Sequence, residues 1–115
     1  MLSHLHRFHG HGSLRYVYRH GASARGKMFG IKYTKNANRI HPRFAIIVSK
    51  KIFKSAVKRN RLRRRLYEAI YLNIGRIAEP YDIAITVFDP QLKDVDFMDM
   101  QKQLLDLLEK EGVIS

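Results

Sequence analysis

The chain has no cysteine and no long run of apolar residues. Without cysteine it can form neither disulfides nor iron–sulfur clusters nor thiolate zinc sites, and it is compatible with a reducing cytoplasm. No window approaches about 18 consecutive apolar residues, so we expect no transmembrane helix. The first residues hold four histidines and no apolar core of a secretory signal, so we expect a cytoplasmic location.

Acidic residues are also scarce. The 115 residues include 10 Asp and Glu against 22 Lys and Arg, which gives a formal net charge of +12 and a pI near 10.3. The length predicts one domain, and an apolar content of 45% is enough for a small core. So large a positive charge attracts polyanions. Nucleic acid is the expected partner, and an acidic membrane surface is the main alternative.

Hydrophobic periodicity predicts a single-domain α+β sandwich, in which helices pack on a small central sheet. We expect strands over residues 28–34, 43–49 and 81–88, where apolar residues alternate or cluster. We expect helices over residues 14–19, over residues 55–77, and from Asp94 or Asp96 to Gly112. Residues 1–12 are predicted to be a flexible His-rich arm, and residues 13–115 are predicted to be the folded domain. Within that domain we expect loops over residues 22–27 and 35–42.

The main functional signal is a run of basic residues around the start of the long predicted helix. Nine cations fall within sixteen residues, and no acidic residue lies among them. We predict that these cations and one asparagine bind RNA: Lys50, Lys51, Lys54, Lys58, Arg59, Asn60, Arg61, Arg63, Arg64 and Arg65. Arginine matches phosphate oxygens with a planar fork, and several neutralised phosphates give strong, salt-sensitive binding. The asparagine offers a donor and an acceptor to a base edge or a ribose hydroxyl.

Helical geometry separates this run from the core. At about 100° per residue, Leu62, Leu66 and Ile70 share the core side of the helix, whereas Arg65 points outward with most of the other cations. Arg59 falls nearer the core direction than a solvent-facing residue should.

Two alternative roles for the basic run stay open. The simpler one is a solvated helix face, although such a face normally pairs Glu with Lys at a spacing of four residues. A membrane-surface helix needs large apolar residues opposite the cations, and here that side is needed for the core.

The basic run resembles the signature of the bacterial ribonuclease P protein family, through Ser49-Lys50-Lys51 and then Ala56-Val57-Lys58-Arg59-Asn60-Arg61-Leu62-Arg63-Arg64. Glu68 also fits, whereas Tyr67 stands where the family has a further arginine, which leaves Arg65 as the candidate to replace its phosphate contact. The stretch from Leu14 to Gly21 is similar to the family's F-x-x-V-[FY]-x-x-G helix, with Leu14 in place of the aromatic.

This resemblance implies a fold and a function. The implied fold is an α–β sandwich with a left-handed crossover through the long basic helix, although parallel crossovers are nearly always right-handed. The implied function is that of the protein subunit of ribonuclease P, which binds the catalytic RNA and the 5′ leader of precursor tRNA. In that ribonucleoprotein the RNA, with Mg²⁺, hydrolyses the bond that frees the mature tRNA 5′ end.

The family holds the leader in a cleft between its first helix and the sheet. The resemblance therefore implies leader-binding residues here, of which Tyr18 is the best match: Phe8, Leu14, Tyr18, Phe29 and Tyr33. Aromatic side chains can stack on the bases of single-stranded RNA. Periodicity alone instead favours core positions for the aromatics, because one face of each strand must pack inward.

No catalytic or metal site of the protein itself is expected. Four histidines near the N-terminus could bind a metal, namely His4, His6, His9 and His11. No carboxylate or cysteine completes a ligand set with them. No nucleophile, base and orienting residue come together either, and three aspartates are expected in turns and caps: Asp82, Asp89 and Asp94. The prediction is a subunit whose RNA partner carries the chemistry. A non-enzymatic RNA-binding or ribosome-associated module is the alternative.

Overall fold

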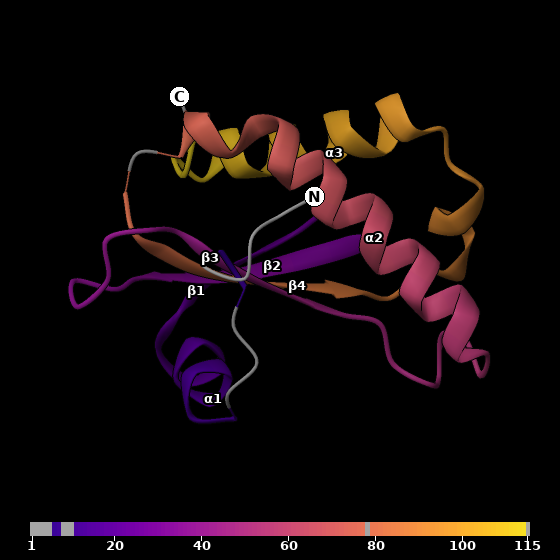
Figure 1. Ribbon diagram of the computed structural model, residues 1–115, viewed down its shortest axis with the longest axis horizontal. Helices are drawn as coiled ribbons and strands as arrows, with labels where there is room; N and C mark the ends of the chain where they lie inside the picture. The colour runs from indigo at the N-terminus through magenta and orange to yellow at the C-terminus, as the bar shows by residue number, and fades with distance from the viewer. Residues whose placement is uncertain (1–5, 8–10, 78, 115) are drawn as a thin grey trace.

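The computed structural model describes residues 6–7, 11–77 and 79–114, with His11 described by its backbone alone. Helices and strands follow along the chain as Figure 1 shows, with short 3-10 helices (η) before and after the last strand. The elements are α1 (His11–His20), β1 (Ala22–Arg25), β2 (Phe29–Lys35), β3 (Arg43–Ile47), α2 (Ala56–Asn73), η2 (Ile74–Arg76), β4 (Tyr81–Val87), η3 (Pro90–Asp94) and α3 (Phe97–Lys110).

The four strands form one mixed sheet in the order β1-β2-β4-β3. β2 pairs antiparallel with β1 and with β4, whereas β3 and β4 are parallel neighbours joined through α2. The predicted α+β class is therefore confirmed. The left-handed sense of the β3–α2–β4 crossover stays a prediction.

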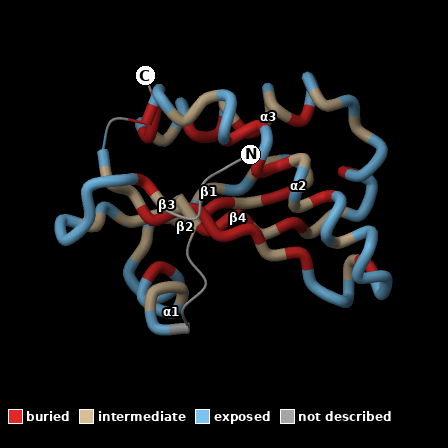
Figure 2. Tube along the Cα trace, in the orientation of Figure 1, coloured by how far each residue is buried: buried red, intermediate tan, exposed pale blue. Residues whose placement is uncertain are grey.

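Helices cover both faces of the sheet. In Figure 1, α2 and α3 lie over one face and α1 lies under the other. The larger core fills the space beneath α2 and α3, because alternate side chains of β2, β3 and β4 point to that face. On the other face a small cluster of Val17, Ala45 and Ala84 allows α1 to approach closely, with Leu14 beside it. Figure 2 shows the buried positions along the sheet and the inner sides of the helices.

The prediction of a loop over residues 22–27 is wrong for Ala22–Arg25, which form the edge strand β1. Three of its four side chains are exposed, so the strand carries no alternation of apolar and polar residues that could reveal it. Pairing with β2 fixes it instead, with Ala22 opposite Tyr33 and Arg25 opposite Gly30. The amide of Gly26 donates to the carbonyl oxygen of Phe29 at 2.9 Å and closes the turn.

Gly21 connects α1 to the sheet. Its amide donates to the carbonyl oxygen of Val17 at 2.8 Å, and an added Cβ would lie 2.5 Å from that oxygen and 2.8 Å from the carbonyl oxygen of Tyr33. Both neighbours are backbone atoms that cannot easily move. Only glycine therefore allows α1 to end directly against β2.

Asp82 is buried, which corrects its predicted place in a turn or cap. Nε and Nη2 of Arg43 donate to its two carboxylate oxygens, each at 2.8 Å, and Nδ2 of Asn36 donates to Oδ2 at 2.8 Å. A buried carboxylate is costly unless it is paired in this way. These hydrogen bonds connect β3, β4 and the loop after β2.

Within the predicted His-rich arm (1–12), α1 begins at His11, and Arg7 forms a parallel bridge with Phe44 of β3. At the other end, Asp89 caps η3 by accepting from the amide of Gln91 at 2.9 Å, as predicted. Gly112, with φ of +77°, follows α3. Within the described ranges, no helix has both the length and the apolar character that crossing a membrane requires.

Candidate nucleic-acid interface

The basic run is presented by the loop before α2 and by the first turns of that helix. The carbonyl oxygen of Ser49 accepts from the amides of Ile52 and Phe53 at 3.0 and 3.3 Å, and the side chain of Phe53 is buried. Ser55 caps α2 by accepting from the amide of Lys58 at 3.3 Å. The loop is thus anchored from inside, and its lysines are left on the outside.

Six of the nine predicted cations are exposed, and we name them the docking face: Lys50, Lys51, Lys54, Lys58, Arg61 and Arg64. Asn60, also exposed, lies among them. None of the ion pairs between described residues involves a docking-face cation. Their positive charge is therefore not offset by an ion pair within the described chain.

Arg59 turns back over the preceding loop. Its Nη1 donates to the carbonyl oxygens of Phe53 and Lys54 at 2.8 and 3.0 Å. This accounts for its core-ward direction, because the core ends below the first turn of α2 and loop carbonyls occupy that place. Arg59 thus holds the loop that carries part of the docking face, and its direct contact with RNA stays a prediction.

Arg65, in contrast, does not point outward as predicted. Its Nη1 donates to the carbonyl oxygens of Lys93 and Leu92 at 3.0 and 3.4 Å, and its Nη2 donates to that of Val95. These carbonyls belong to η3 and the residue after it. Arg65 therefore joins α2 to the segment that leads into α3, and the predicted phosphate contact does not fit this geometry.

The side of α2 that faces β3 carries Asn60, Arg63 and Tyr67. Nη1 of Arg63 donates to Oδ1 of Asn60 at 3.0 Å, which fixes that amide and leaves its nitrogen available to an acceptor. Tyr67 is buried, and the guanidinium carbon of Arg7 lies 4.6 Å from the centre of its ring. Burial raises the pKa of Tyr67, whereas the charges of Arg7 and Arg63 oppose that rise.

On the opposite face of the sheet, α1 presents Tyr18. Its hydroxyl lies 2.9 Å from Oγ1 of Thr86, and the residue remains 38% exposed. Nζ of Lys32 donates to the carbonyl oxygen of Tyr18 at 3.1 Å and lies 5.3 Å from the ring centre. Leu14 is half-buried against the small core. An open aromatic ring with an adjacent cation suits single-stranded RNA, and leader binding by Tyr18 and Leu14 stays a prediction.

Phe29 and Tyr33 do not share this face. Phe29 is 1% exposed in the large core, and the hydroxyl of Tyr33 donates to Glu111, just after α3, at 2.8 Å. The prediction that both line a cleft with α1 is wrong, because they occupy the positions of β2 that point to the other side. The predicted contact of Phe8 lies outside the described residues.

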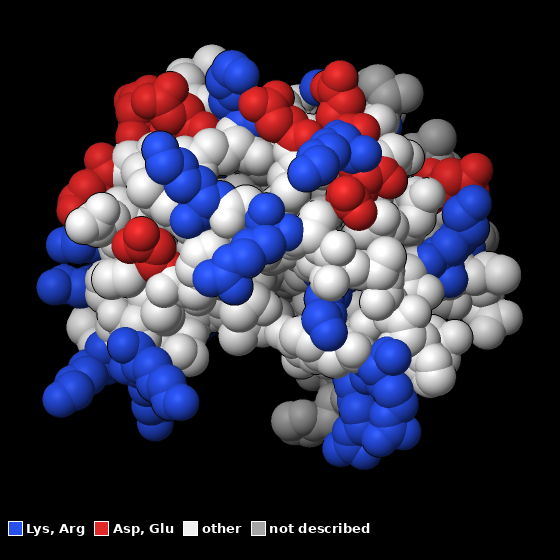
Figure 3. Space-filling view, turned by 180° about the vertical axis from the view of Figure 1, so that it is seen from behind, with Lys and Arg blue, Asp and Glu red and all other residues white. Residues whose placement is uncertain are grey.

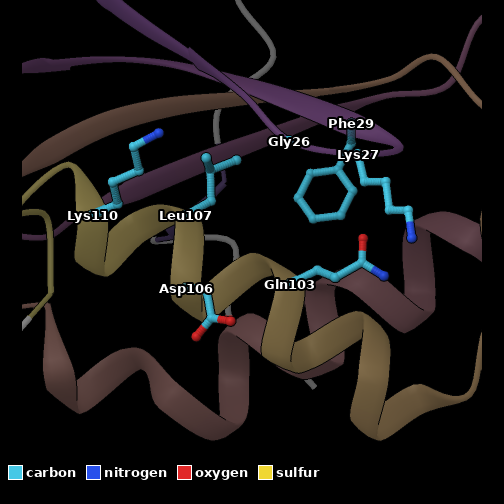
Figure 4. A pocket seen from close by; sticks show the side chains of 7 residues that line it. All are labelled: Gly26, Lys27, Phe29, Gln103, Asp106, Leu107 and Lys110. Atoms are coloured by element: carbon cyan, nitrogen blue, oxygen red, sulfur yellow. The ribbon is translucent and has the colours of Figure 1, made fainter.

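A cavity lies between the β1–β2 turn and α3, on the same side as Phe29. Figure 4 shows the Phe29 ring beside Leu107, with the amide of Gln103 directed toward Lys27 and the carboxylate of Asp106 turned away from the sheet. Oε1 of Gln103 is buried and has no hydrogen-bond partner among the described residues. The cavity is separated by the sheet from α1.

Metal binding finds no support in the described residues. His4, His9 and the side chain of His11 lie outside them, so their predicted alternative as ligands is untested. Nδ1 of His6 donates to the carbonyl oxygen of Pro42 at 2.9 Å, and its ring meets that of His41. Over the described ranges, no three His, Cys, Asp or Glu side chains gather as a metal site would require.

Charge is distributed unevenly over the surface. Figure 3 shows acidic side chains gathered with a few basic ones over the part of the molecule formed by α3, while basic side chains project from the lower edge. The acidic residues of α3 include Asp99, Asp106 and Glu109, all exposed. A polyanion therefore meets a more favourable field at the basic edge than over α3.

Three residues of these surfaces were absent from the sequence-based predictions. Lys32 and Thr86 occupy strand positions that alternate with buried ones, so the period of two in β2 and β4 could have revealed that they face α1. Arg7 had no such signal, since its segment has no periodicity.

Fold and surface define a small α+β domain of the nucleic-acid-binding class, with a basic helix and a second, aromatic surface across the sheet. The chain belongs to the ribonuclease P protein family: the family model described as Ribonuclease P matches residues 2–112. It is therefore a protein component of the ribonuclease P ribonucleoprotein, with a role in tRNA processing and with ribonuclease P RNA as its partner. This assignment favours the ribonuclease P prediction over the ribosome-associated and membrane-surface alternatives.

Relatives and solved structures agree with this assignment. The chain is 38% identical over 100 residues to the ribonuclease P protein component of Clostridioides difficile, covering 86% of this chain and 85% of that one. It is 34% identical over 100 residues to the ribonuclease P protein component of Clostridium botulinum (strain Loch Maree), covering 86% of this chain and 87% of that one.

Among solved structures, the Staphylococcus aureus RNase P protein superimposes with a TM-score of 0.84 and 25% identity, over 96% of this chain and 98% of that one. The RNase P protein of Thermotoga maritima superimposes with a TM-score of 0.77 and 27% identity, over 84% of this chain and 89% of that one.

Proposed function

We propose that the docking face binds the phosphate backbone of ribonuclease P RNA. The observation that carries this is the group of six exposed cations with no ion-pair partner among the described residues. Each phosphate that such a group contacts releases counterions, which favours binding. Phe53 and Arg59 hold the loop that carries three of these cations, so little of the binding free energy is lost in ordering it.

The surface beside α1 is proposed to hold the 5′ leader of precursor tRNA. The exposed ring of Tyr18 offers a stacking surface for a base, and Lys32 offers a cation to the adjoining phosphate. This surface lies under the sheet, whereas α2 lies over it (Figure 1). The catalytic RNA and the leader could therefore occupy the chain at the same time.

We assign the hydrolysis itself to the RNA. The docking face has no carboxylate, and the described residues offer no group of three His, Cys, Asp or Glu side chains that could hold Mg²⁺. Phosphate and other oxygen ligands of the RNA suit that ion. The proposed role of the chain is to bring two polyanions together and to orient them, in the cytoplasm.

The decisive experiment is reconstitution with a bacterial ribonuclease P RNA at low Mg²⁺, with cleavage of precursor tRNA as the readout. The chain is expected to stimulate cleavage, and no stimulation would contradict the proposal. Arg61→Ala combined with Arg64→Ala should reduce the slope of log affinity against log salt by about 1.4–1.8, the value for two phosphate contacts. Lys102→Ala, on α3 and 3.0 Å from Asp106, is a control that also removes positive charge and should leave the slope unchanged.

A further inference from the structure

Arg7 is held against α2 by contacts made far from it in sequence. Its backbone forms a parallel bridge with Phe44 at the edge of the sheet, and the neighbouring His6 is bonded to the carbonyl oxygen of Pro42. The guanidinium carbon lies 4.6 Å from the centre of the Tyr67 ring. The position of this cation is therefore fixed on both sides, by the sheet edge and by the helix.

The charge of Arg7 has no acidic partner among the described residues. None of the ion pairs between them includes Arg7, and its Nε is buried without a hydrogen-bond partner there. A buried guanidinium donor normally has an acceptor, because leaving it unpaired costs free energy. The ring of Tyr67 compensates for the positive charge but accepts no directed hydrogen bond from Nε. The terminal nitrogens of the same guanidinium are not among the buried unpaired atoms, so an acceptor supplied by a partner molecule can reach the group there.

A second arginine stands next to this one. Arg63 precedes Tyr67 by one helical turn and lies on the same side of α2. The guanidinium of Arg7 lies over the Tyr67 ring, and Arg63 stands one helical turn before that ring. Neither arginine has a carboxylate in ion-pair contact among the described residues, so the pair forms a site for an anion with several oxygens.

We propose that Arg7 and Arg63 together bind one phosphate of the ribonuclease P RNA backbone, at the side of α2 that faces β3. The inference rests on the proposed binding of that RNA by the docking face. It extends the RNA surface around the helix, past Asn60, to the edge of the sheet. The segment that contains Arg7 is then part of the RNA site and is not a free arm.

The test measures how the affinity for a bacterial ribonuclease P RNA transcript depends on salt, with the full chain. Arg7→Gln removes the charge and keeps a planar group over Tyr67, whereas Arg7→Lys keeps the charge. The glutamine variant should lower the slope of log affinity against log salt, by up to about 0.7–0.9, while the lysine variant should retain it. Lys102→Ala is again the charge-matched control and should behave like the unchanged chain.

Sharing of one phosphate is tested by the double variant Arg7→Gln/Arg63→Gln. Its slope should fall by about 0.7–0.9 in total, the value for a single phosphate. A loss twice as large would indicate two separate phosphates and overturn the shared site. An unchanged slope for Arg7→Gln would show that Arg7 only covers Tyr67. If the unchanged chain does not bind the RNA at all, the proposed function fails instead, so the two failures are distinguishable.

Discussion

Arg64 and Arg65 are neighbours in α2 with opposite predicted roles, and this makes them a matched pair. Replacing either with alanine removes one charge and changes helix propensity by the same small amount. Arg64 is exposed and belongs to the docking face, whereas Arg65 donates to three carbonyl oxygens in and after η3. We predict that Arg65→Ala destabilises the fold and that Arg64→Ala weakens RNA binding.

The magnitude follows from the three hydrogen bonds of Arg65. The bonds to Leu92 and Val95 are partly buried, whereas the bond to Lys93 is exposed and can be replaced by water. The Leu92 bond is also long, at 3.4 Å. With charged donors contributing about 1.5–3 kcal/mol per well-formed bond, we expect Arg65→Ala to cost about 2–3 kcal/mol of unfolding free energy. Arg64→Ala should stay within about 0.5 kcal/mol.

Urea unfolding followed by circular dichroism measures this difference, and the melting temperature of Arg65→Ala should fall by roughly 8–12 °C. Arg65→Lys should also destabilise, because one ammonium group cannot span the same carbonyls as a planar fork. In RNA binding, Arg64→Ala should flatten the salt dependence by about 0.7–0.9 and Arg65→Ala should not. Equal stabilities of the two alanine variants, or equal loss of salt dependence, would refute the division of roles.

Three further predictions concern other parts of the molecule. Tyr18→Ala should weaken the binding of precursor tRNA more than that of mature tRNA, by about 1–3 kcal/mol if a base stacks there, and equal losses would place the ring outside the leader site. Gly21→Ala should lower the unfolding free energy by about 1–3 kcal/mol, because its Cβ would lie 2.5 Å from the carbonyl oxygen of Val17; an unaltered urea midpoint would show that the backbone relaxes. The pKa of Tyr33 is raised from 10.0 to about 12, by burial first and then by its bond to Glu111, so its contribution to stability should be complete below pH 10 and be lost as the pH rises toward 12. Spectrophotometric titration should show a smaller rise in Glu111→Gln.

The elements that could be predicted are those whose apolar residues follow a regular pattern. β2, β4 and α2 were located because apolar residues recur with a period of two or of about 3.6, and β3 was located because its apolar residues form a short dense run. Leu62, Leu66 and Ile70 are buried on the core side of α2, as predicted. β1 has no such pattern, since its exposed residues are held by backbone pairing with β2. Pairing between segments is not encoded in local periodicity.

The direction of long side chains was the less predictable part of the site. A helical wheel places Arg59 near the core and Arg65 outside it, but the ends of both side chains follow carbonyl groups of distant or irregular segments. Those carbonyls come from the loop before α2 and from η3, and no pattern in the sequence predicts where they lie. The contact of Arg7 with Tyr67 depends in the same way on the fold of the whole chain.

These inward arginines explain how nine cations without an interleaved acid can share one segment. Main-chain carbonyl dipoles stabilise the charges of Arg59 and Arg65, and Arg63 is bonded to Asn60, so the charges that no such contact offsets are mainly those of the six exposed cations. Repulsion among exposed charges is weak in water and is screened by salt, so the fold tolerates it. Carboxylates on the same helix face would remove that repulsion, but they would also compete with phosphate for each cation. The absence of acidic residues from this segment therefore has a small cost in the free chain and leaves the cations available to RNA.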